Sequence, residues 1–333
     1  MNQSSKTAIV TGSNGYIGGQ TVRAFKDQGY SVLGIDWRNI RNRNVADGFL
    51  HSNCSYPSIA EFAAYNEVET IVHTAGSSLV GPSVKDPAEY YLNNVGNTAS
   101  FLKNLADHGW KGNFIFSSSA SVYGDPEYTP IDEDHYTNPI SPYGNSKLAV
   151  EMLLKDAATA YGMGMVALRY FNACGADVTA KHGQEPNATH LVARICENAL
   201  NPIGKLTIFG NNYPTHDGTC IRDYVHVQDI ADAHLVAASI AKPGSFQVYN
   251  LGDGVGHSNL EVIRAFEEVS ALKVNYEFGP RRDGDPAILV ADARKFCTVS
   301  GWAPKYSDLA TIVSTAYNWY RSDTFKLLKK DDV

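Results

Sequence analysis

Short apolar runs alternate along the first half of the chain with longer segments in which apolar residues recur at helical spacing. Each run is long enough for one buried strand, and each segment between them is long enough for one helix. Strands that alternate with helices in this way are typical of a parallel sheet covered by helices on both faces. We therefore predict an α/β fold built on a doubly wound parallel sheet. The predicted strands are residues 7–11, 30–35, 69–76, 113–117 and 165–170.

Three glycines follow the first predicted strand at a regular spacing. Gly12, Gly15 and Gly18 lie between that strand and a helical segment, and the next strand closes on Asp36. Glycines here let the backbone approach a pyrophosphate at the helix N-terminus, and the acidic residue can bond a ribose hydroxyl. This unit predicts a Rossmann-type site for NAD, although the glycines alone would also suit an ordinary strand–helix turn. Arg38 leaves NADP open, because a nearby arginine can bind its 2′-phosphate.

Tyr143 and Lys147 form a second candidate for chemistry, four residues apart in a predicted helix. Residues at this spacing share one helix face. A phenol titrates near ~10, and a neighbouring ammonium lowers its pKa by favouring the phenolate. The pair therefore predicts a tyrosine that abstracts a proton. The alternative is an ordinary tyrosine and lysine on a solvated helix surface.

Polar residues also end two other predicted strands of the same sheet. A run of serines, residues 117–119, ends the strand that begins at 113, and Asn172 follows the strand at 165–170. Ligands of such sheets bind beyond the carboxyl ends of the strands. We therefore expect these residues to lie near the tyrosine and lysine.

The character of the sequence changes after Asn172, where residues 175–187 are polar and rich in turn formers. We predict that residues 1–172 form an NAD-binding domain, to which segments at about 223–252 return. Residues 173–222 and 253–333 are predicted to form a smaller, interleaved C-terminal lobe that binds the substrate. A length of 333 residues suits about two such units.

Composition narrows the partners and the compartment. A net charge of -7 offers no bulk attraction to nucleic acid or anionic membranes. No stretch approaches the ~20 apolar residues of a membrane span. The five cysteines include no CxxC pair, which excludes a disulfide framework and a zinc site and suits a reducing compartment. We expect a cytoplasmic protein with no metal site and no nucleic-acid or membrane partner.

With these motifs placed, the chain resembles the extended short-chain dehydrogenase/reductases, and within them it is most similar to the UDP-glucose 4-epimerases. The similarity runs from Thr11 to about Trp319. Its most specific stretches are residues 117–124, 141–151, 168–172, 208–215, 217–219, 221–227 and 281–285.

The resemblance implies an isomerase that inverts carbon 4 of a UDP-hexose, with UDP-glucose and UDP-galactose as default substrates and bound NAD as cofactor. Tyr143 would take the proton of the sugar 4-hydroxyl, and Ser119 would hydrogen-bond the same oxygen. Lys147 would hold the nicotinamide ribose. Hydride would pass to NAD⁺ and return to the other face of a transient 4-keto sugar, without net redox change.

The resemblance also implies which residues contact the two ligands. The cofactor residues are Gly12, Gly15, Tyr16, Ile17, Gly18, Asp36, Asn53, Cys54, Thr74, Ala75, Gly76, Asn94, Ser117, Tyr143, Lys147 and Tyr170. The substrate residues are Ser119, Ser121, Tyr143, Asn172, His190, Leu191, Phe209, Arg222, Tyr224, Arg282, Asp285 and Leu289. Arginines suit a diphosphate because they make charge-assisted, forked hydrogen bonds, but surface ion pairs are a common alternative role for them.

Related enzymes that dehydrate or decarboxylate nucleotide sugars place extra carboxylates just after the catalytic serine or threonine. Here those positions are Ala120 and Ser121, which favours plain epimerisation. Two alternatives stay open: a nucleotide-sugar reductase or dehydrogenase with net redox, and a catalytically idle NAD-binding regulatory protein. Asn53 and Ser78 support the latter, because many relatives carry an aspartate and a lysine there.

Three further expectations follow from the resemblance. Leu289 stands where a bulky tyrosine excludes N-acetyl sugars in some epimerases, so the N-acetyl forms are candidate substrates. His190 is expected on the substrate side, although a buried, hydrogen-bonded structural role is an alternative. A homodimer is expected through the helices at about 90–105 and 147–160.

Overall fold

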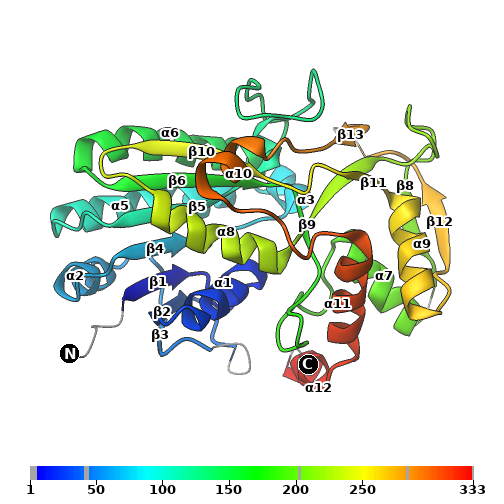
Figure 1. The fold of residues 1–333 in the computed structure, drawn as a ribbon, viewed down its shortest axis with the longest axis horizontal. Helices are drawn as coiled ribbons and strands as arrows, with labels where there is room; N and C mark the ends of the chain where they lie inside the picture. The colour runs from blue at the N-terminus through cyan, green and yellow to red at the C-terminus, as the bar shows by residue number, and fades with distance from the viewer. Residues whose placement is uncertain (1–5, 41–44, 202–203, 283–284, 332–333) are drawn as a thin grey trace.

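The computed structural model describes residues 6–40, 45–201, 204–282 and 285–331. Seven parallel strands form the central sheet in the order β10-β6-β5-β4-β1-β2-β3, which confirms the predicted doubly wound parallel sheet (Figure 1). The order turns back beside β1, and a ligand site is expected at such a switch point. The strands are β1 (Thr7–Thr11), β2 (Ser31–Asp36), β3 (Gly48–His51), β4 (Thr70–His73), β5 (Asn113–Ser119), β6 (Gly164–Tyr170) and β10 (Phe246–Leu251).

Helices cover both faces of this sheet, because alternate residues of each strand point to opposite faces. In β1, Ile9 joins the core beneath one helical layer, while Ala8 and Val10 join the core beneath the other. The first layer comprises α2 (Pro57–Tyr65), α5 (Asn97–Asp107) and α6 (Pro142–Tyr161). The second comprises α1 (Tyr16–Asp27), α8 (Val227–Ile240) and α10 (Arg294–Ser300). Figure 1 shows α1 and α8 packed side by side.

The segment between β4 and α5 is irregular, although the sequence predicts one helix there. It contains α3 (Val80–Lys85), α4 (Pro87–Tyr90) and a π-helical turn, η1 (Tyr91–Gly96), that runs into α5. Asn94 lies in η1 and is buried. Wide turns of this kind occur mostly at functional sites.

A second lobe packs around its own apolar core, which includes Trp319, Phe266 and Ile195 (Figure 1). Its helices are α7 (Leu191–Leu200), α9 (Asn259–Ser270), α11 (Leu309–Arg321) and α12 (Asp323–Asp331). Its strands are β7 (Asn172–Cys174), β8 (Leu206–Phe209), β9 (Ile221–His226), β11 (Gly256–Ser258), β12 (Tyr276–Gly279) and β13 (Ile288–Leu289). A short 3-10 turn, η2 (Ala120–Val122), follows β5.

The chain crosses between the two lobes several times. β9 pairs with β7, β11 and β13 outside the main sheet, whereas α8 and β10 return to the sheet. Phe296 of α10 also packs in the core of the main sheet, although it lies within residues 253–333. The division at 172, 223–252 and 253–333 stays a prediction, with α10 an observed departure from it.

Candidate active site

Three residues from β5 and α6 come together at the carboxyl end of the sheet. Ser119 ends β5, and Tyr143 and Lys147 lie on the first turns of α6. Ser141 caps this helix by accepting a hydrogen bond from the Gly144 amide at 3.1 Å, so the chain enters the helix in a fixed orientation. The Ser119 side chain lies close enough to the Tyr143 phenol to affect its pKa. The Lys147 ammonium lies 5.9 Å from the centre of the Tyr143 ring and donates to the Ser117 carbonyl at 2.9 Å.

Burial controls the charge states of this pair. The pKa of Tyr143 is raised above its usual value, first because the phenol is buried, while the Ser119 side chain opposes the shift and Tyr90 adds to it. Burial also lowers the pKa of Lys147 to about 8, against the attraction of Glu151. The low phenol pKa predicted from the neighbouring ammonium is therefore not found in this state of the protein, because burial raises the pKa and Lys147 is not among the groups that shift it.

A buried ion pair between Glu151 and Arg169 is hydrogen-bonded to the serine segment. Glu151 accepts hydrogen bonds from the Ser118 hydroxyl at 2.5 Å and from Arg169 Nε at 3.0 Å. Arg169 also donates to the Tyr123 hydroxyl at 2.9 Å, which donates to Asn250. Sequence reasoning did not assign Glu151 or Arg169 a role. The available signal was that Glu151 follows Lys147 by four residues and so shares its helix face.

The glycine loop after β1 forms a close-packed cradle. Gly12 has a φ of +71°, and a Cβ there would lie 2.8 Å from the Ala75 nitrogen. A Cβ on Gly18 would lie 2.1 Å from the Gly12 carbonyl oxygen. No acidic residue occupies the first turn of α1, and its N-cap, Gly15, has no side-chain hydrogen bond. This helix end can therefore present its amides to an anion.

Asp36 ends β2 beside this cradle and is buried. Its carboxylate accepts hydrogen bonds from the amides of Asn14 at 3.0 Å and Arg38 at 2.8 Å. The Arg38 guanidinium lies 3.6 Å from a Cβ built on Gly15, and its NH1 group is 3.0 Å from both carboxylate oxygens of Glu185. Arg38, the residue that kept NADP as a candidate cofactor, is therefore paired with a carboxylate of the loop after β7.

That loop is also hydrogen-bonded to the first turns of α1. Tyr16 donates from its hydroxyl to the Gly175 carbonyl at 2.8 Å, and the His182 ring contacts the Tyr16 carbonyl at 2.7 Å. Gln20 donates to Asp177 at 3.2 Å. The predicted cofactor residue Ile17 lies in the same turn of α1.

Other predicted cofactor residues line the edge of the sheet between β4 and β6. Thr74, Ala75 and Gly76 follow β4, and Asn94 holds the next residue, Ser77, by accepting from its amide at 2.7 Å and donating to its carbonyl at 3.0 Å. Ser117 and Tyr170 lie on the neighbouring strands β5 and β6, and the Tyr170 ring lies edge-on to the His234 ring with 6.3 Å between their centres.

The predicted adenine end lies beyond β3, at Asn53 and Cys54. Asn53 accepts from the amide of Ser55 at 3.0 Å with its side-chain oxygen, and Cys54 is buried in the core.

These residues fit a dinucleotide. The cradle at Gly12 and Gly18 has no room for a side chain, and the end of α1 is free of acidic residues. The Asn14 side-chain oxygen, beside Asp36, is buried without a hydrogen-bond partner in the described part of the chain. Such an acceptor suits a ribose hydroxyl or an amine.

The predicted substrate residues lie mainly in the second lobe. Arg222 of β9 is buried and pairs with Asp285, and its NH2 group also donates to the Pro286 carbonyl at 2.7 Å. The Arg282 guanidinium lies 4.1 Å above the centre of the Phe209 ring, so a ring predicted to contact the substrate holds an arginine here. Residues 283–284 of this stretch lie outside the described residues.

The remaining substrate candidates fall at three places. Asn172 of β7 pairs with Tyr224 of β9, whose ring is buried in the second-lobe core. Leu289 of β13 packs against the cluster that contains Ala120 and Phe171, beside the serine segment. The hydroxyl of Ser119 donates to that of Ser121 at 3.2 Å.

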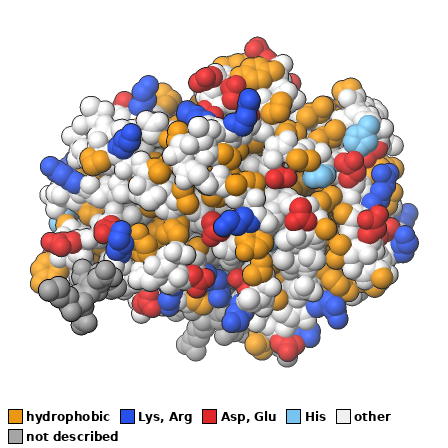
Figure 2. Space-filling view, in the orientation of Figure 1, with side chains coloured by type: hydrophobic (Ala, Val, Ile, Leu, Met, Phe, Trp, Pro, Cys, Tyr) orange, Lys and Arg blue, Asp and Glu red, His pale blue; other side chains and the backbone are white. Residues whose placement is uncertain are grey.

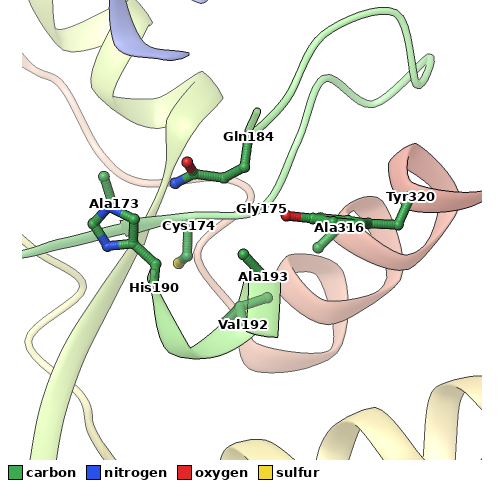
Figure 3. A pocket seen from close by; sticks show the side chains of 9 residues that line it. All are labelled: Ala173, Cys174, Gly175, Gln184, His190, Val192, Ala193, Ala316 and Tyr320. Carbon is green, nitrogen blue, oxygen red and sulfur yellow. The ribbon is translucent and has the colours of Figure 1, made fainter. Parts of the chain in front are cut away.

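His190 lines a pocket between β7, α7 and α11, and it directly precedes α7 without a side-chain capping bond (Figure 3). Its ring keeps contact with solvent, while the protein around it lowers its pKa. The buried Gln184 amide also lines this pocket, and its nitrogen has no partner in the described part of the chain. In the described residues no cluster of three histidine, cysteine or acidic side chains could hold a metal ion.

Comparison with known proteins agrees with this geometry. Residues 8–252 match the model of the NAD dependent epimerase/dehydratase family. The chain is 40% identical over 320 residues to a UDP-glucose 4-epimerase of Halalkalibacterium halodurans, covering 94% of this chain and 95% of that protein.

Solved structures show the same likeness. A Bifidobacterium longum UDP-glucose 4-epimerase in complex with NAD⁺ and UDP superposes with a TM-score of 0.88 at 33% identity, covering 96% of this chain and 99% of that one. The UDP-Glc/GlcNAc 4-epimerase of Campylobacter jejuni superposes with a TM-score of 0.79 at 36% identity, covering 94% and 98%. With a matching family model over most of its length and relatives of this similarity, the chain belongs to the NAD dependent epimerase/dehydratase family.

Proposed function

We propose that the chain is an NAD-dependent 4-epimerase of UDP-hexoses, with UDP-glucose and UDP-galactose as its substrates. The observation that carries the proposal is the meeting of Ser119, Tyr143 and Lys147 at the sheet edge that also holds the glycine cradle. The two residues after Ser119 are alanine and serine, so the site has no carboxylate there for dehydration or decarboxylation.

In this proposal Tyr143 exchanges the proton of the sugar 4-hydroxyl, since its phenol lies close to the Ser119 side chain. The Ser119 hydroxyl orients the same sugar oxygen. Bound NAD supplies a reversible hydride acceptor, which lets carbon 4 be oxidised and re-reduced with no net redox change. Lys147 places a positive charge beside the phenol, and Ser117 fixes that charge by accepting from it at 2.9 Å. A phenolate formed during the reaction gains from this ammonium.

The second lobe supplies the positive charge for the diphosphate. Arg222 and Arg282 lie on two segments of this lobe, one paired with Asp285 and the other stacked on Phe209. An arriving diphosphate can replace the carboxylate and the ring as partner of these groups.

The direct test is to incubate the purified protein with UDP-galactose, with no added reductant, and to follow UDP-glucose by chromatography. Conversion to an equilibrium mixture, with cofactor that stays oxidised overall, is the expected result. Steady accumulation of NADH would indicate a dehydrogenase instead. Absence of conversion with every UDP-hexose, by protein that retains NAD, would support a regulatory NAD-binding protein.

Leu289 extends the proposal to the N-acetylhexosamines. It packs against the apolar cluster that contains Ala120 and Phe171, and Ala120 directly follows the serine segment where the sugar ring is proposed to lie. A leucine leaves more room there than a tyrosine. The Campylobacter jejuni structure of a UDP-Glc/GlcNAc 4-epimerase supports this substrate range within the family.

A homodimer in the cytoplasm completes the proposal. Tyr91 and Leu92 beside α5, and Met152 of α6, are exposed, as a helix-mediated interface requires. Light scattering should give twice the chain mass of 36.3 kDa.

All five cysteines are free, which suits a reducing compartment. No helix in the described ranges combines the length and the apolar character of a membrane span, and Figure 2 shows acidic and basic side chains interspersed over the visible face.

A further inference from the structure

We infer that Glu151 and Arg169, the buried ion pair between α6 and β6, are positioning residues that hold Ser119 in place for the proton transfer. The inference rests on the proposed function and adds to it two residues that the sequence did not assign to either ligand. Its basis is that the chain is bonded to this pair both before and after Ser119.

The helix that carries the proposed base also holds the end of β5. Lys147 and Glu151 are four residues apart on α6, so they share one face of it. Lys147 donates to the Ser117 carbonyl at 2.9 Å, and Glu151 accepts from the Ser118 hydroxyl at 2.5 Å. Successive turns of α6 therefore hold the two consecutive residues that lead into Ser119.

Arg169 connects this contact to the neighbouring strand. It lies on β6, directly opposite Ser118 in the register of the sheet. Its Nε donates to one carboxylate oxygen of Glu151 at 3.0 Å, and its NH2 group donates to the other at 2.5 Å. A forked pair of this kind fixes the orientation of the carboxylate, because the two planar groups match in geometry. Ser118 therefore donates to an acceptor that is itself held in place.

The chain after Ser119 is bonded to the same arginine. The NH1 group of Arg169 donates to the Tyr123 hydroxyl at 2.9 Å, and that hydroxyl donates to Asn250 of β10 at 2.7 Å. The guanidinium carbon also lies 4.8 Å from the centre of the Tyr123 ring. Tyr123 directly follows the turn η2, which begins after Ser119. Ser119 is therefore anchored through the residue before it and through the residue four positions after it.

A role in stability alone is the alternative for this ion pair. Burying two charges costs solvation, and apolar side chains of similar size are often as stable in such a place, so stability does not by itself require the pair. The Ser119 side chain lies close enough to the Tyr143 phenol to affect its pKa. A small displacement of Ser119 would therefore change a contact that the proposed proton transfer uses.

The first test is Ser118→Ala in the full-length protein, which removes one hydroxyl and leaves the ion pair intact. We expect kcat with UDP-galactose to fall roughly 10-fold, as for a slightly misplaced group, at unchanged KM and unchanged bound NAD. The matched control is Ser307→Ala, because Ser307 also donates from a buried hydroxyl to a buried carboxylate, that of Asp229, at 2.6 Å. Ser307→Ala should keep the wild-type kcat.

The second test removes the pair as a whole. The double variant Glu151→Leu/Arg169→Met leaves no buried charge without its partner, so it should fold with a melting temperature near that of the wild type. We expect it to lose at least as much kcat as Ser118→Ala. If it does not fold, Ser118→Ala alone decides the question.

Crystal structures of the wild type and Ser118→Ala test the positioning directly. We expect the Ser119 oxygen to move by more than about 0.5 Å relative to the Tyr143 hydroxyl, which exceeds the tolerance of a catalytic contact.

Wild-type kcat in Ser118→Ala or in the folded double variant would overturn the inference, and so would an unchanged position of Ser119. Each result would leave the ion pair with a role in stability alone. The crystal structures do not depend on turnover, so they test the positioning even in a protein that does not epimerise UDP-galactose. A wild-type protein inactive with every UDP-hexose would instead contradict the proposed function.

Discussion

Tyr143 and Ser119 divide the proposed proton chemistry between them. Replacing Tyr143 with phenylalanine keeps the ring in its buried position and removes the acid–base group. We expect kcat to fall roughly 10³-fold for Tyr143→Phe and by about 10² for Ser119→Ala, within the range of general acid–base catalysis. Initial rates with UDP-galactose measure both. The content of bound NAD should be unchanged in Ser119→Ala, and wild-type rates in Tyr143→Phe would remove the tyrosine from the mechanism.

Leu289 allows a test of substrate range by one substitution. Tyrosine at this position adds a ring against the apolar cluster that contains Ala120 and Phe171. We expect Leu289→Tyr to reduce turnover of UDP-N-acetylgalactosamine at least 10-fold relative to UDP-galactose, because a steric clash penalises the larger sugar alone. The measurement is the ratio of kcat/KM for the two substrates. Leu289→Met is the matched control, and an unchanged ratio in Leu289→Tyr would place the acetamido group elsewhere.

For single residues, the sequence predicted which side chains come together better than it predicted their pKa values. The spacing of Tyr143 and Lys147 was enough to place them together, because a helix fixes the geometry between such residues. The pKa of Tyr143 was not predictable, because it depends on burial by elements distant in the chain. The hydrogen bond between the Ser117 hydroxyl and His234 was equally hidden, since the two residues are 117 positions apart.

Among the elements, the loop between β7 and α7 connects the two lobes at the cofactor site. Glu185 of this loop pairs with Arg38 beyond β2, and Asp36 lies beside the same guanidinium. Two carboxylates around one arginine leave a net negative charge. This arrangement disfavours the 2′-phosphate of NADP despite the presence of the arginine.

We expect Glu185→Gln to raise the affinity for NADPH relative to NADH by roughly 5- to 10-fold, because Arg38 then becomes available for charge-assisted bonds. Fluorescence titration with the two nucleotides gives the ratio. The gain should disappear in the double variant Arg38→Ala/Glu185→Gln. A ratio that Glu185→Gln leaves unchanged would show that Asp36 alone excludes NADP.

The order of strands and helices was predictable because their periodicities are local, and the structure confirms the parallel sheet. The π-helical turn η1 was not, because its sequence has ordinary helical spacing and the wide turn depends on Asn94 reaching Ser77 and Ser146. The return of α10 to the main sheet was missed for a similar reason, since Phe296 packs against residues far away in the sequence.

For the whole molecule, three buried histidines make stability sensitive to acid. Burial lowers the pKa of His73 to about 3 and the pKa values of His226 and His234 to about 4. Their usual value is near ~6.5, so each takes up a proton on unfolding once the pH falls below that value. Asp223 acts in the opposite direction, because burial raises its pKa to about 6 and its folded form binds a proton first.

We expect the free energy of unfolding to fall by roughly 4 kcal/mol between pH 7 and pH 5, because the three histidines together cost more than Asp223 offsets. Urea denaturation at the two pH values measures the difference. His73→Gln should reduce the dependence on pH by about one histidine's share. Equal stability at pH 7 and pH 5 would contradict the neutral, buried state of these rings.

The hydrogen bonds between the loop after β7 and the region of α1 limit how far the two lobes can move apart during turnover. Tyr16, Gln20 and Arg38 are all bonded to this loop, so the lobes cannot swing apart without breaking several contacts at once. A ketone formed halfway through epimerisation must therefore turn in place, by rotation about its own diphosphate bonds. In the proposed reaction these contacts would help to keep the ketone within the protein while the sugar turns.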